Sequence, residues 1–223
     1  MNTSRWLQSL VVGRPDLYRA IYDWNAYPHR WALPVWLAEA ALPPAVVSLL
    51  EGSSRGRERL RRHFTRALGL EQTWWDFQEP RARVALLGAE ALLRLARYAG
   101  AALHASRLAR VIAKEERRAL TQRIGEDAYA FGMRSARAAN VSVLKVAAHG
   151  NLPEDVDRSG WEVVAACLKP EPVAVHARLR LKVAPEINLP TGEAVALDSA
   201  PAWELMQAVS KEALRPEEAR CLA

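Results

Sequence analysis

The sequence predicts a mainly α-helical protein, built as a compact helical domain around two long central helices. Leu and Ala dominate the composition and half of the chain is apolar, which favours helices and supplies a sizeable core. Two long segments, 81–103 and 107–138, repeat their apolar residues at helical spacing. We expect one helical domain over residues 1–223, with loosely ordered ends at 1–14 and 215–223.

Segment 81–103 is the centre of this prediction. Its polar residues Arg83, Glu90, Arg94 and Arg97 follow one another at steps of seven, four and three, which places them on one side of a helix. The rest of the helix surface is apolar, so most of its circumference should be buried. Its length also suits a membrane span, but a carboxylate and two guanidiniums in mid-segment would be costly in lipid, which favours a core helix.

A second long helix is expected over 107–138, because apolar residues recur there at steps of three and four. These residues are Leu108, Val111, Ile112, Leu120, Ile124, Ala128 and Phe131. The opposite face carries charges of both signs, which is typical of a helix with one solvent-exposed side. We expect this helix to pack along the first one.

Near the N-terminus, a short helix over 16–25 should lead into a Pro-bounded aromatic loop over 24–37, which holds three tryptophans. Two interpretations stay open. The aromatic side chains seal one end of the helical core, as Trp is usually mostly buried, or some indoles form an exposed docking patch, as Trp is enriched in interface hot spots. For the second interpretation, Trp31 and Trp36 are the candidate partner-binding residues.

Two short helices follow, over 34–41 and 45–51. Pro34 and Pro44 stand at or next to their first turns, where a missing backbone N–H does no harm.

A basic surface helix is expected over 55–66. Leu60, Phe64 and Leu68 give it a thin apolar seam, while arginines cover the rest of its circumference. A solvated charged face is the commoner meaning of such a run. The alternative is contact with an anionic surface, for which Arg59 and Arg62 are candidates.

The C-terminal third should hold a short buried helix over 161–168 and a last helix over 201–214. Between them, apolar and polar residues alternate over 173–183, which predicts a half-exposed strand. Such a strand is at most part of a minor β ribbon paired with 193–197, or else an extended arm. Arg178 and Arg180 would share one face of it.

No motif predicts catalysis or metal binding. The histidines are scattered without a second ligand at helical spacing, and no nucleophile or phosphate-binding motif accompanies them. They are His29, His63, His104, His149 and His176. The two cysteines, Cys167 and Cys221, form no disulfide or zinc pattern. We expect a cytosolic protein that is not an enzyme and takes no cofactor, metal or small-molecule substrate.

Several features, in order, resemble one known family. They are TyrProHis, LeuPro and TrpLeu within 25–37, LeuLeuGly to GlyAlaAlaLeuHis over 86–104, ArgLeuAlaArgValIle at 107–112, TrpGluValValAlaAlaCysLeu at 161–168 and ArgLeuArgLeu at 178–181. The chain is similar to the K subunit of the bacterial type III secretion sorting platform, the YscK-like family, over roughly residues 15–215.

The resemblance implies a mainly helical, non-catalytic cytosolic adaptor at the cytosolic face of the inner membrane. Such a protein links the forkhead-associated-like cytoplasmic domain of the inner-membrane ring protein to the C-ring, or pod, protein and so to the ATPase complex. Membrane association would then run through the ring protein only.

The contact residues are predicted from this sequence and not from the family. One patch would hold Trp31 and Trp36, and the arginines Arg59, Arg62, Arg178 and Arg180 would meet acidic surface at another. A formal charge of +6 also leaves a basic helical nucleic-acid-binding protein as the alternative, although neither a recognition helix nor a stacking platform is recognisable.

Overall fold

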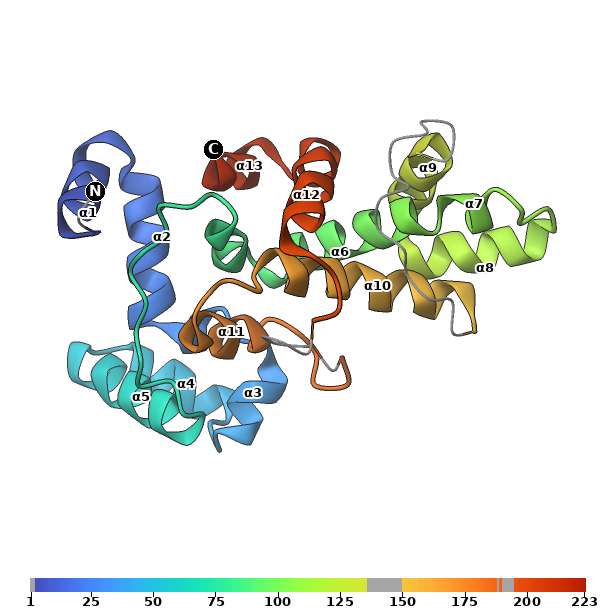
Figure 1. The fold of residues 1–223 in the computed structure, drawn as a ribbon. Helices are drawn as coiled ribbons and strands as arrows, with labels where there is room; N and C mark the ends of the chain where they lie inside the picture. Colours follow the sequence, from blue (N-terminus) through green and yellow to red (C-terminus); the bar gives the residue numbers. More distant parts are fainter. Residues whose placement is uncertain (1–2, 136–149, 188, 190–194) are drawn as a thin grey trace. The chain divides into compact units, whose positions relative to one another are not determined.

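The computed structural model describes residues 3–135, 150–187, 189 and 195–223 (Figure 1). Across these ranges the chain forms thirteen α-helices, two short 3-10 segments and no strand, so the predicted mainly α-helical fold is confirmed. In the described part of the chain, every helix is too short or too polar to cross a membrane.

The chain divides into two compact units. Unit 1 comprises Met1–Ala89 and Glu171–Ile187, and unit 2 comprises Glu90–Pro170 and Asn188–Ala223. Each unit has its own set of packed helices. The single-domain organisation expected for residues 1–223 stays a prediction.

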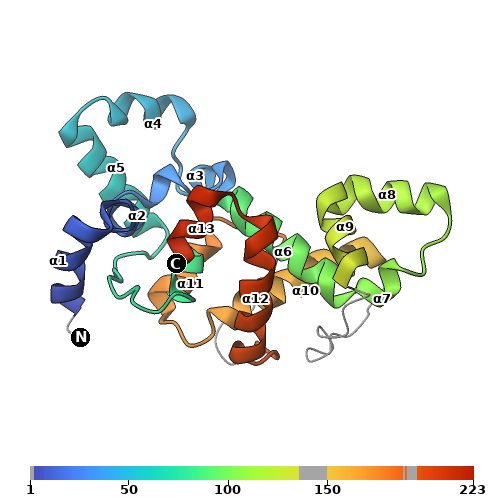
Figure 2. The same cartoon turned by 90° about the horizontal axis from the view of Figure 1, so that it is seen from above.

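Unit 1 joins the N-terminal elements to one helix from far along the chain. Its elements are α1 (Thr3–Gly13), α2 (Pro15–Ala26), η1 (Pro28–Arg30), α3 (Pro34–Glu39), α4 (Pro44–Glu51), α5 (Ser54–Ala67), η2 (Ala82–Leu86) and α11 (Val173–Arg180). Helix α4 packs against α5, α5 also contacts η1, and α11 packs against η2. Helices α3, α4 and α5 lie together in both views (Figures 1 and 2).

Proline fixes where several of these helices begin. Pro15, Pro34 and Pro44 each occupy the first turn of a helix, where their fixed φ suits helical backbone. The core of the α3–α5 region then forms from the apolar seams of these helices and from α11's end. Its buried members are Trp36, Ala40, Leu42, Leu60, Phe64, Leu70 and Leu181.

Segment 173–183 is not a strand, so that prediction is wrong. It forms α11 and a following turn, with Val173 77 % exposed while His176 and Arg178 are buried. A lone strand would leave its backbone groups unpaired, whereas a helix satisfies them within itself. Residues 193 and 194 of the expected pairing segment lie outside the described residues.

The turn after α11 buries a lysine. The Nζ of Lys182 donates to the carbonyl oxygens of Ala85 and Leu87 at 2.7 and 2.6 Å, and the ammonium also lies 4.7 Å from the ring centroid of Trp31. Both carbonyls come from η2 and its end, so this side chain ties two distant segments of unit 1 together. A buried ammonium is tolerated because acceptors and an aromatic face surround it.

Unit 2 is also built of helices. Its elements are α6 (Ala89–Leu103), α7 (Ala105–Leu108), α8 (Lys114–Ile124), α9 (Glu126–Ser135), α10 (Leu152–Cys167), α12 (Ser199–Ala213) and α13 (Pro216–Leu222). Helix α10 is the hub, because α12 and α8 both pack on it, while α9 packs on α7 and α8. Helices α1 and α13 occupy the two terminal segments for which loose order was expected.

Helices α6 and α10 approach each other through glycines. A Cβ built on Gly100 of α6 would lie 1.9 Å from the carbonyl oxygen of Val156, and one on Gly160 of α10 would lie 1.9 Å from that of Ala96. Real atoms never come so close. Only glycine at these two positions permits the observed distance between the backbones.

The first predicted long helix is interrupted. Segment 81–103 forms η2 and α6, because Leu87 is extended with φ −60° and ψ 149°. The buried side chain of Leu87 and the acceptors that hold Arg83 favour this break over a continuous helix. The Arg83 guanidinium donates to the carbonyl oxygens of Phe77 and Gln78, both at 2.9 Å.

The charged stripe of α6 is real but finds partners on other helices. Arg94 pairs with Glu218 of α13 at 2.6 Å, and Arg97 pairs with Asp157 of α10 at 3.6 Å. Arg94 and Arg97 therefore contribute to packing within unit 2, while Glu90 of the same stripe is exposed.

The second predicted long helix, 107–138, is three shorter helices, α7, α8 and α9. Gly125 separates α8 from α9 with φ 96°, a backbone region that glycine adopts without strain. Ile112, expected in the core, lies in the α7–α8 connection and is 92 % exposed. The other expected core residues that are buried are Leu108, Leu120, Ile124, Ala128 and Phe131; residues 136–138 lie outside the described residues.

Candidate protein-interaction surface

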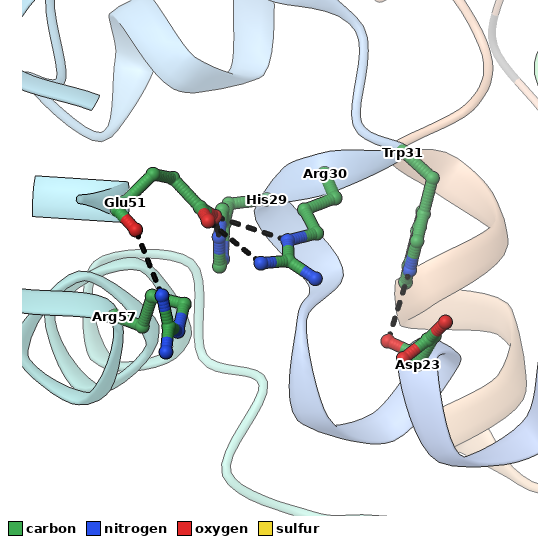
Figure 3. Close-up of polar contacts among 6 residues, drawn as sticks. All are labelled: Asp23, His29, Arg30, Trp31, Glu51 and Arg57. Carbon is green, nitrogen blue, oxygen red and sulfur yellow. Dashed lines mark hydrogen bonds and ion pairs between the residues drawn. The ribbon is translucent and has the colours of Figure 1, made fainter. Parts of the chain in front are cut away.

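Glu51, the last residue of α4, contacts polar side chains from two other elements of unit 1 (Figure 3). Its carboxylate lies 2.7 Å from Nε2 of His29 and accepts hydrogen bonds from Nε and Nη2 of Arg30 at 3.0 and 2.6 Å. Its backbone carbonyl accepts from Nη1 of Arg57 at 2.9 Å. We call His29, Arg30, Glu51 and Arg57 the Glu51 cluster, and it joins η1, α4 and α5.

The charges of the Glu51 cluster are well defined at neutral pH. Hydrogen bonds from Arg30 and then from His29 lower the pKa of Glu51 to about 2, so its carboxylate is ionised. Burial lowers the pKa of His29, although Glu51 acts in the opposite direction. Nδ1 of His29 is buried without a hydrogen-bond partner among the described atoms, which further disfavours a second ring proton.

The start of α5 is fixed by two further contacts. The Ser53 hydroxyl accepts a hydrogen bond from the backbone N–H of Gly56 at 2.9 Å, which caps the helix. A Cβ on Gly56 would lie 2.1 Å from the carbonyl oxygen of Leu50, so α4 and α5 approach closely at this point. Together with the Glu51 cluster, these contacts set the orientation of α5 about its own axis.

Helix α5 presents four arginines on one outer face. Leu60 and Phe64 are fully buried and point into unit 1. On the opposite side, exposed arginines follow one another at steps of four, three and four residues, which return to one side of a helix. We call this set the arginine stripe; it consists of Arg55, Arg59, Arg62 and Arg66.

One carboxylate lies beside the arginine stripe. Glu58 accepts hydrogen bonds from Nε and Nη2 of Arg61 at 2.9 and 2.6 Å and from Nη2 of Arg62 at 3.3 Å. The hydrogen bonds from Arg61 are the main reason that the pKa of Glu58 is lowered to about 2. Within the described residues, no side-chain hydrogen bond or ion pair involves Arg55, Arg59 or Arg66.

The two tryptophans predicted to bind a partner, Trp31 and Trp36, lie mainly inside unit 1. Trp36 is 2 % exposed, and its Nε1 donates to the carbonyl oxygen of Val183 at 3.0 Å. Trp31 is half-buried and stacks on Trp24 with ring centroids 6.2 Å apart, while its Nε1 donates to the Asp23 carbonyl at 3.4 Å. These contacts favour the interpretation in which the aromatic loop seals a core, and they leave only part of Trp31 for a partner.

The predicted basic pair of α11 is divided between inside and outside. Arg178 is 1 % exposed; its guanidinium donates to the carbonyl oxygens of Leu70, at 2.8 Å, and Gln72. Burial lowers its pKa to about 10. Arg180 is exposed and lies 4.8 Å from the ring centroid of Trp36. Arg178 is thus a packing residue here, while Arg59, Arg62 and Arg180 are available at the surface.

Sequence reasoning missed two parts of this surface. Arg55 and Arg66 were within the predicted basic helix, and their spacing to Arg59 and Arg62 was a signal for one shared face. The Glu51 cluster had no such signal, because His29 and Arg30 reach Glu51 from 22 and 21 positions away through the folding of η1 onto α4 and α5.

A buried histidine and serine of unit 2 form a structural hydrogen-bond chain. Nε2 of His104 lies 2.9 Å from Oγ of Ser159, and that hydroxyl donates to the backbone carbonyl of Asp155 at 2.5 Å. The hydroxyl hydrogen of Ser159 is therefore already donated to a backbone oxygen. In this pair, Nε2 of His104 donates a hydrogen bond to Ser159 and does not accept one. In the described ranges, no group of His, Cys, Asp and Glu side chains is arranged to hold a metal ion; His149 lies outside them.

Comparison with known proteins identifies a family. The family model described as "YOP proteins translocation protein K (YscK)" matches residues 20–218 of the 223. No curated protein and no solved structure matches the chain.

Proposed function

The chain belongs to the YscK family and is a type III secretion protein, and from this premise we propose that it is a non-catalytic cytosolic adaptor of the sorting platform. The adaptor links the cytoplasmic domain of the inner-membrane ring protein to the C-ring, or pod, protein and so to the ATPase complex. It works at the cytosolic face of the inner membrane and associates with the membrane through the ring protein.

The observation that carries this proposal is the extent of the family match. Residues 20–218 include unit 1 from residue 20 onward and all but the last five residues of unit 2, so the family relationship concerns both units and not one module. An adaptor needs separate surfaces for separate partners. Two compact units, each with its own packed helices, suit that requirement by offering one body to each partner.

The charge of unit 1 supports an acidic partner for one of the two surfaces. The arginine stripe is exposed, and its nearest carboxylate, Glu58, is engaged by Arg61 and Arg62. Complementary charge gives partner specificity and speeds association even where it adds little affinity. The same stripe is the observation that favours the alternative, a basic helical nucleic-acid-binding protein.

Affinity capture of the full-length protein from native cells tests the adaptor function. Bound proteins are identified by mass spectrometry in samples with and without nuclease, beside a capture from cells that lack the tagged chain. The expected result is recovery of an inner-membrane ring protein and a C-ring protein, unchanged by nuclease. Recovery of nucleic-acid-associated proteins that disappear with nuclease would overturn the proposal in favour of the alternative.

A further inference from the structure

We propose that the arginine stripe of α5 is a docking surface for an acidic helix of a protein partner. The inference rests on the proposed function, because an adaptor requires a protein-binding surface, and it deepens that function by assigning one surface and the chemistry of its occupant. Residues Arg55, Arg59, Arg62 and Arg66 would each face a carboxylate.

The geometry of the stripe suits a helix. At about 1.5 Å of rise per residue, its four guanidinium-bearing residues span roughly 16 Å along α5. Their steps of four, three and four residues are the steps at which any α-helix returns to one face. A partner helix with Asp or Glu at the same steps presents a carboxylate row of matching length. Arginine adds bidentate geometry, because its planar fork donates two parallel hydrogen bonds to one carboxylate.

One residue of the stripe, Arg62, has a carboxylate partner in the described chain, at 3.3 Å from Glu58, whereas Arg55, Arg59 and Arg66 have none there. Helix α5 contains six arginines and one glutamate, and that glutamate is held by Arg61 and Arg62. Pairs of like charge three or four residues apart destabilise a helix. Arg55 with Arg59 and Arg62 with Arg66 are such pairs, so the isolated protein carries a repulsion that a row of carboxylates would relieve.

The stripe is also held in place before any partner binds. The Glu51 cluster, the Ser53 cap and the close approach at Gly56 fix the start of α5. The burial of Leu60 and Phe64 fixes its rotation. Binding therefore orders side chains only, and the entropic cost of arranging the helix is already met by unit 1.

The surroundings favour a protein helix over the other anionic partners. None of the exposed large hydrophobic residues of the described chain lies on α5. The stripe thus has neither an aromatic platform on which unpaired bases would stack nor an apolar residue to insert into a membrane. Its charges alone remain for recognition, and they stand in one straight row.

Direct binding by the purified full-length protein tests this assignment. The probe is a labelled helical peptide of about 18 residues whose four glutamates repeat the steps of the stripe; the control peptide has the same composition with its glutamates spread around the helix. Fluorescence anisotropy is recorded at low and at physiological salt. We expect the row peptide to bind about tenfold more tightly than the control peptide at low salt, with a smaller difference at physiological salt.

Matched variants separate the stripe from net charge. The double variant Arg59→Gln/Arg66→Gln removes two stripe charges, and Arg117→Gln/Arg118→Gln removes two exposed charges from α8. Only the first variant should lose affinity for the row peptide, by about tenfold. Circular dichroism and thermal melting check that both variants stay folded. Equal weakening by both variants, or equal affinity for the two peptides, overturns the proposal.

Two further probes test the other partner classes with the same variants. They are duplex DNA and vesicles containing phosphatidylglycerol. Tighter binding of either than of the row peptide, sensitive to Arg59→Gln/Arg66→Gln, also overturns the acidic-helix assignment. The affinity-capture experiment tests the adaptor function separately. If Arg59→Gln/Arg66→Gln still captures the ring protein and the C-ring protein, the adaptor function is supported and the docking site lies elsewhere.

Discussion

Gly100 and Gly160 are reciprocal contact points of two helices in unit 2. Each lies where the backbone of the other helix passes: a Cβ on Gly100 would meet the Val156 carbonyl oxygen, and a Cβ on Gly160 the Ala96 carbonyl oxygen, both at 1.9 Å. Helices α6 and α10 therefore pack backbone to backbone at this crossing. Even a methyl group at either position must push the helices apart.

We predict that Gly100→Ala lowers the free energy of unfolding by about 1–3 kcal/mol, because overpacking at a rigid crossing outweighs the better helix propensity of alanine. Gly13→Ala is the control, since no atom lies within 4 Å of a Cβ at that position; it should be neutral or slightly stabilising. Urea unfolding followed by circular dichroism measures both. A Gly100→Ala variant as stable as the control would show that α6 and α10 are farther apart.

Trp36→Ala should destabilise unit 1 rather than remove a binding surface. Its indole is 2 % exposed and donates to Val183, so truncation leaves a cavity and an unpaired carbonyl, with an expected loss of about 3–5 kcal/mol. Trp31→Ala should cost less, because Trp31 is half-buried. The measurement is chemical denaturation of both variants; a stable Trp36→Ala protein that no longer binds its partner would restore the docking interpretation for this residue.

Arg178→Met and Arg180→Met form a matched pair with opposite expectations. The first removes the guanidinium that donates to the Leu70 and Gln72 carbonyls, and leaving these acceptors without their donor should cost about 1–3 kcal/mol. The second changes an exposed side chain and should stay within about 0.5 kcal/mol of the parent protein. Comparable denaturation midpoints for the two variants would contradict the buried placement of Arg178.

Stability should fall as the pH drops through the titration range of histidine. Burial lowers the folded-state pKa of His29, His104 and His176 below the ordinary value of 6.5. Below about pH 6.5 the unfolded chain therefore binds protons that the folded chain does not, and each group can contribute a slope of up to about 1.4 kcal/mol per pH unit. The stability that neutral histidines provide is present at higher pH and is lost on acidification.

Denaturation midpoints between pH 7.5 and 6 measure this slope. Half-buried Asp157 and Glu171, whose pKa values are raised by burial, act in the opposite direction at lower pH, so the window ends at pH 6. His29→Gln should give a smaller slope than the parent protein. An unchanged slope in that variant would mean that His29 titrates normally in the folded state.

The apolar seam of α5 and the buried segment of α10 follow from spacing alone, because a helix that buries one side repeats its large apolar residues every three or four positions. Leu60 and Phe64 are where that rule places them. Local spacing fails where two periods compete. In 173–183 the alternation suits a strand, yet the segment is helical, and the consequence falls on Arg178 and Arg180. Two residues apart, they share a face in a strand, but in a helix they are about 200° apart, so one is buried and the other exposed.

Contacts between distant segments have no local signature. His29 and Glu51 meet because η1, α4 and α5 fold together, and nothing in either segment announces the other. Likewise, the apolar repeat of the sequence continues through Gly125, although the positive φ of this residue ends α8 in the structure. The arginine stripe is intermediate: its residues are recognisable in the sequence, but which side of α5 faces outward depends on the burial of Leu60 and Phe64 in unit 1.

The buried ammonium of Lys182 allows local opening of unit 1 to be measured. An amine-acylating reagent needs an accessible, uncharged nitrogen, and Lys182 is surrounded by two carbonyl oxygens and an indole. Exposed Lys114 and Lys211 of unit 2 should react at once, whereas Lys182 waits for the contact between η2 and the end of α11 to break. The labelling rate of Lys182, measured by peptide mass mapping, therefore reports the rate of that local opening in the intact protein.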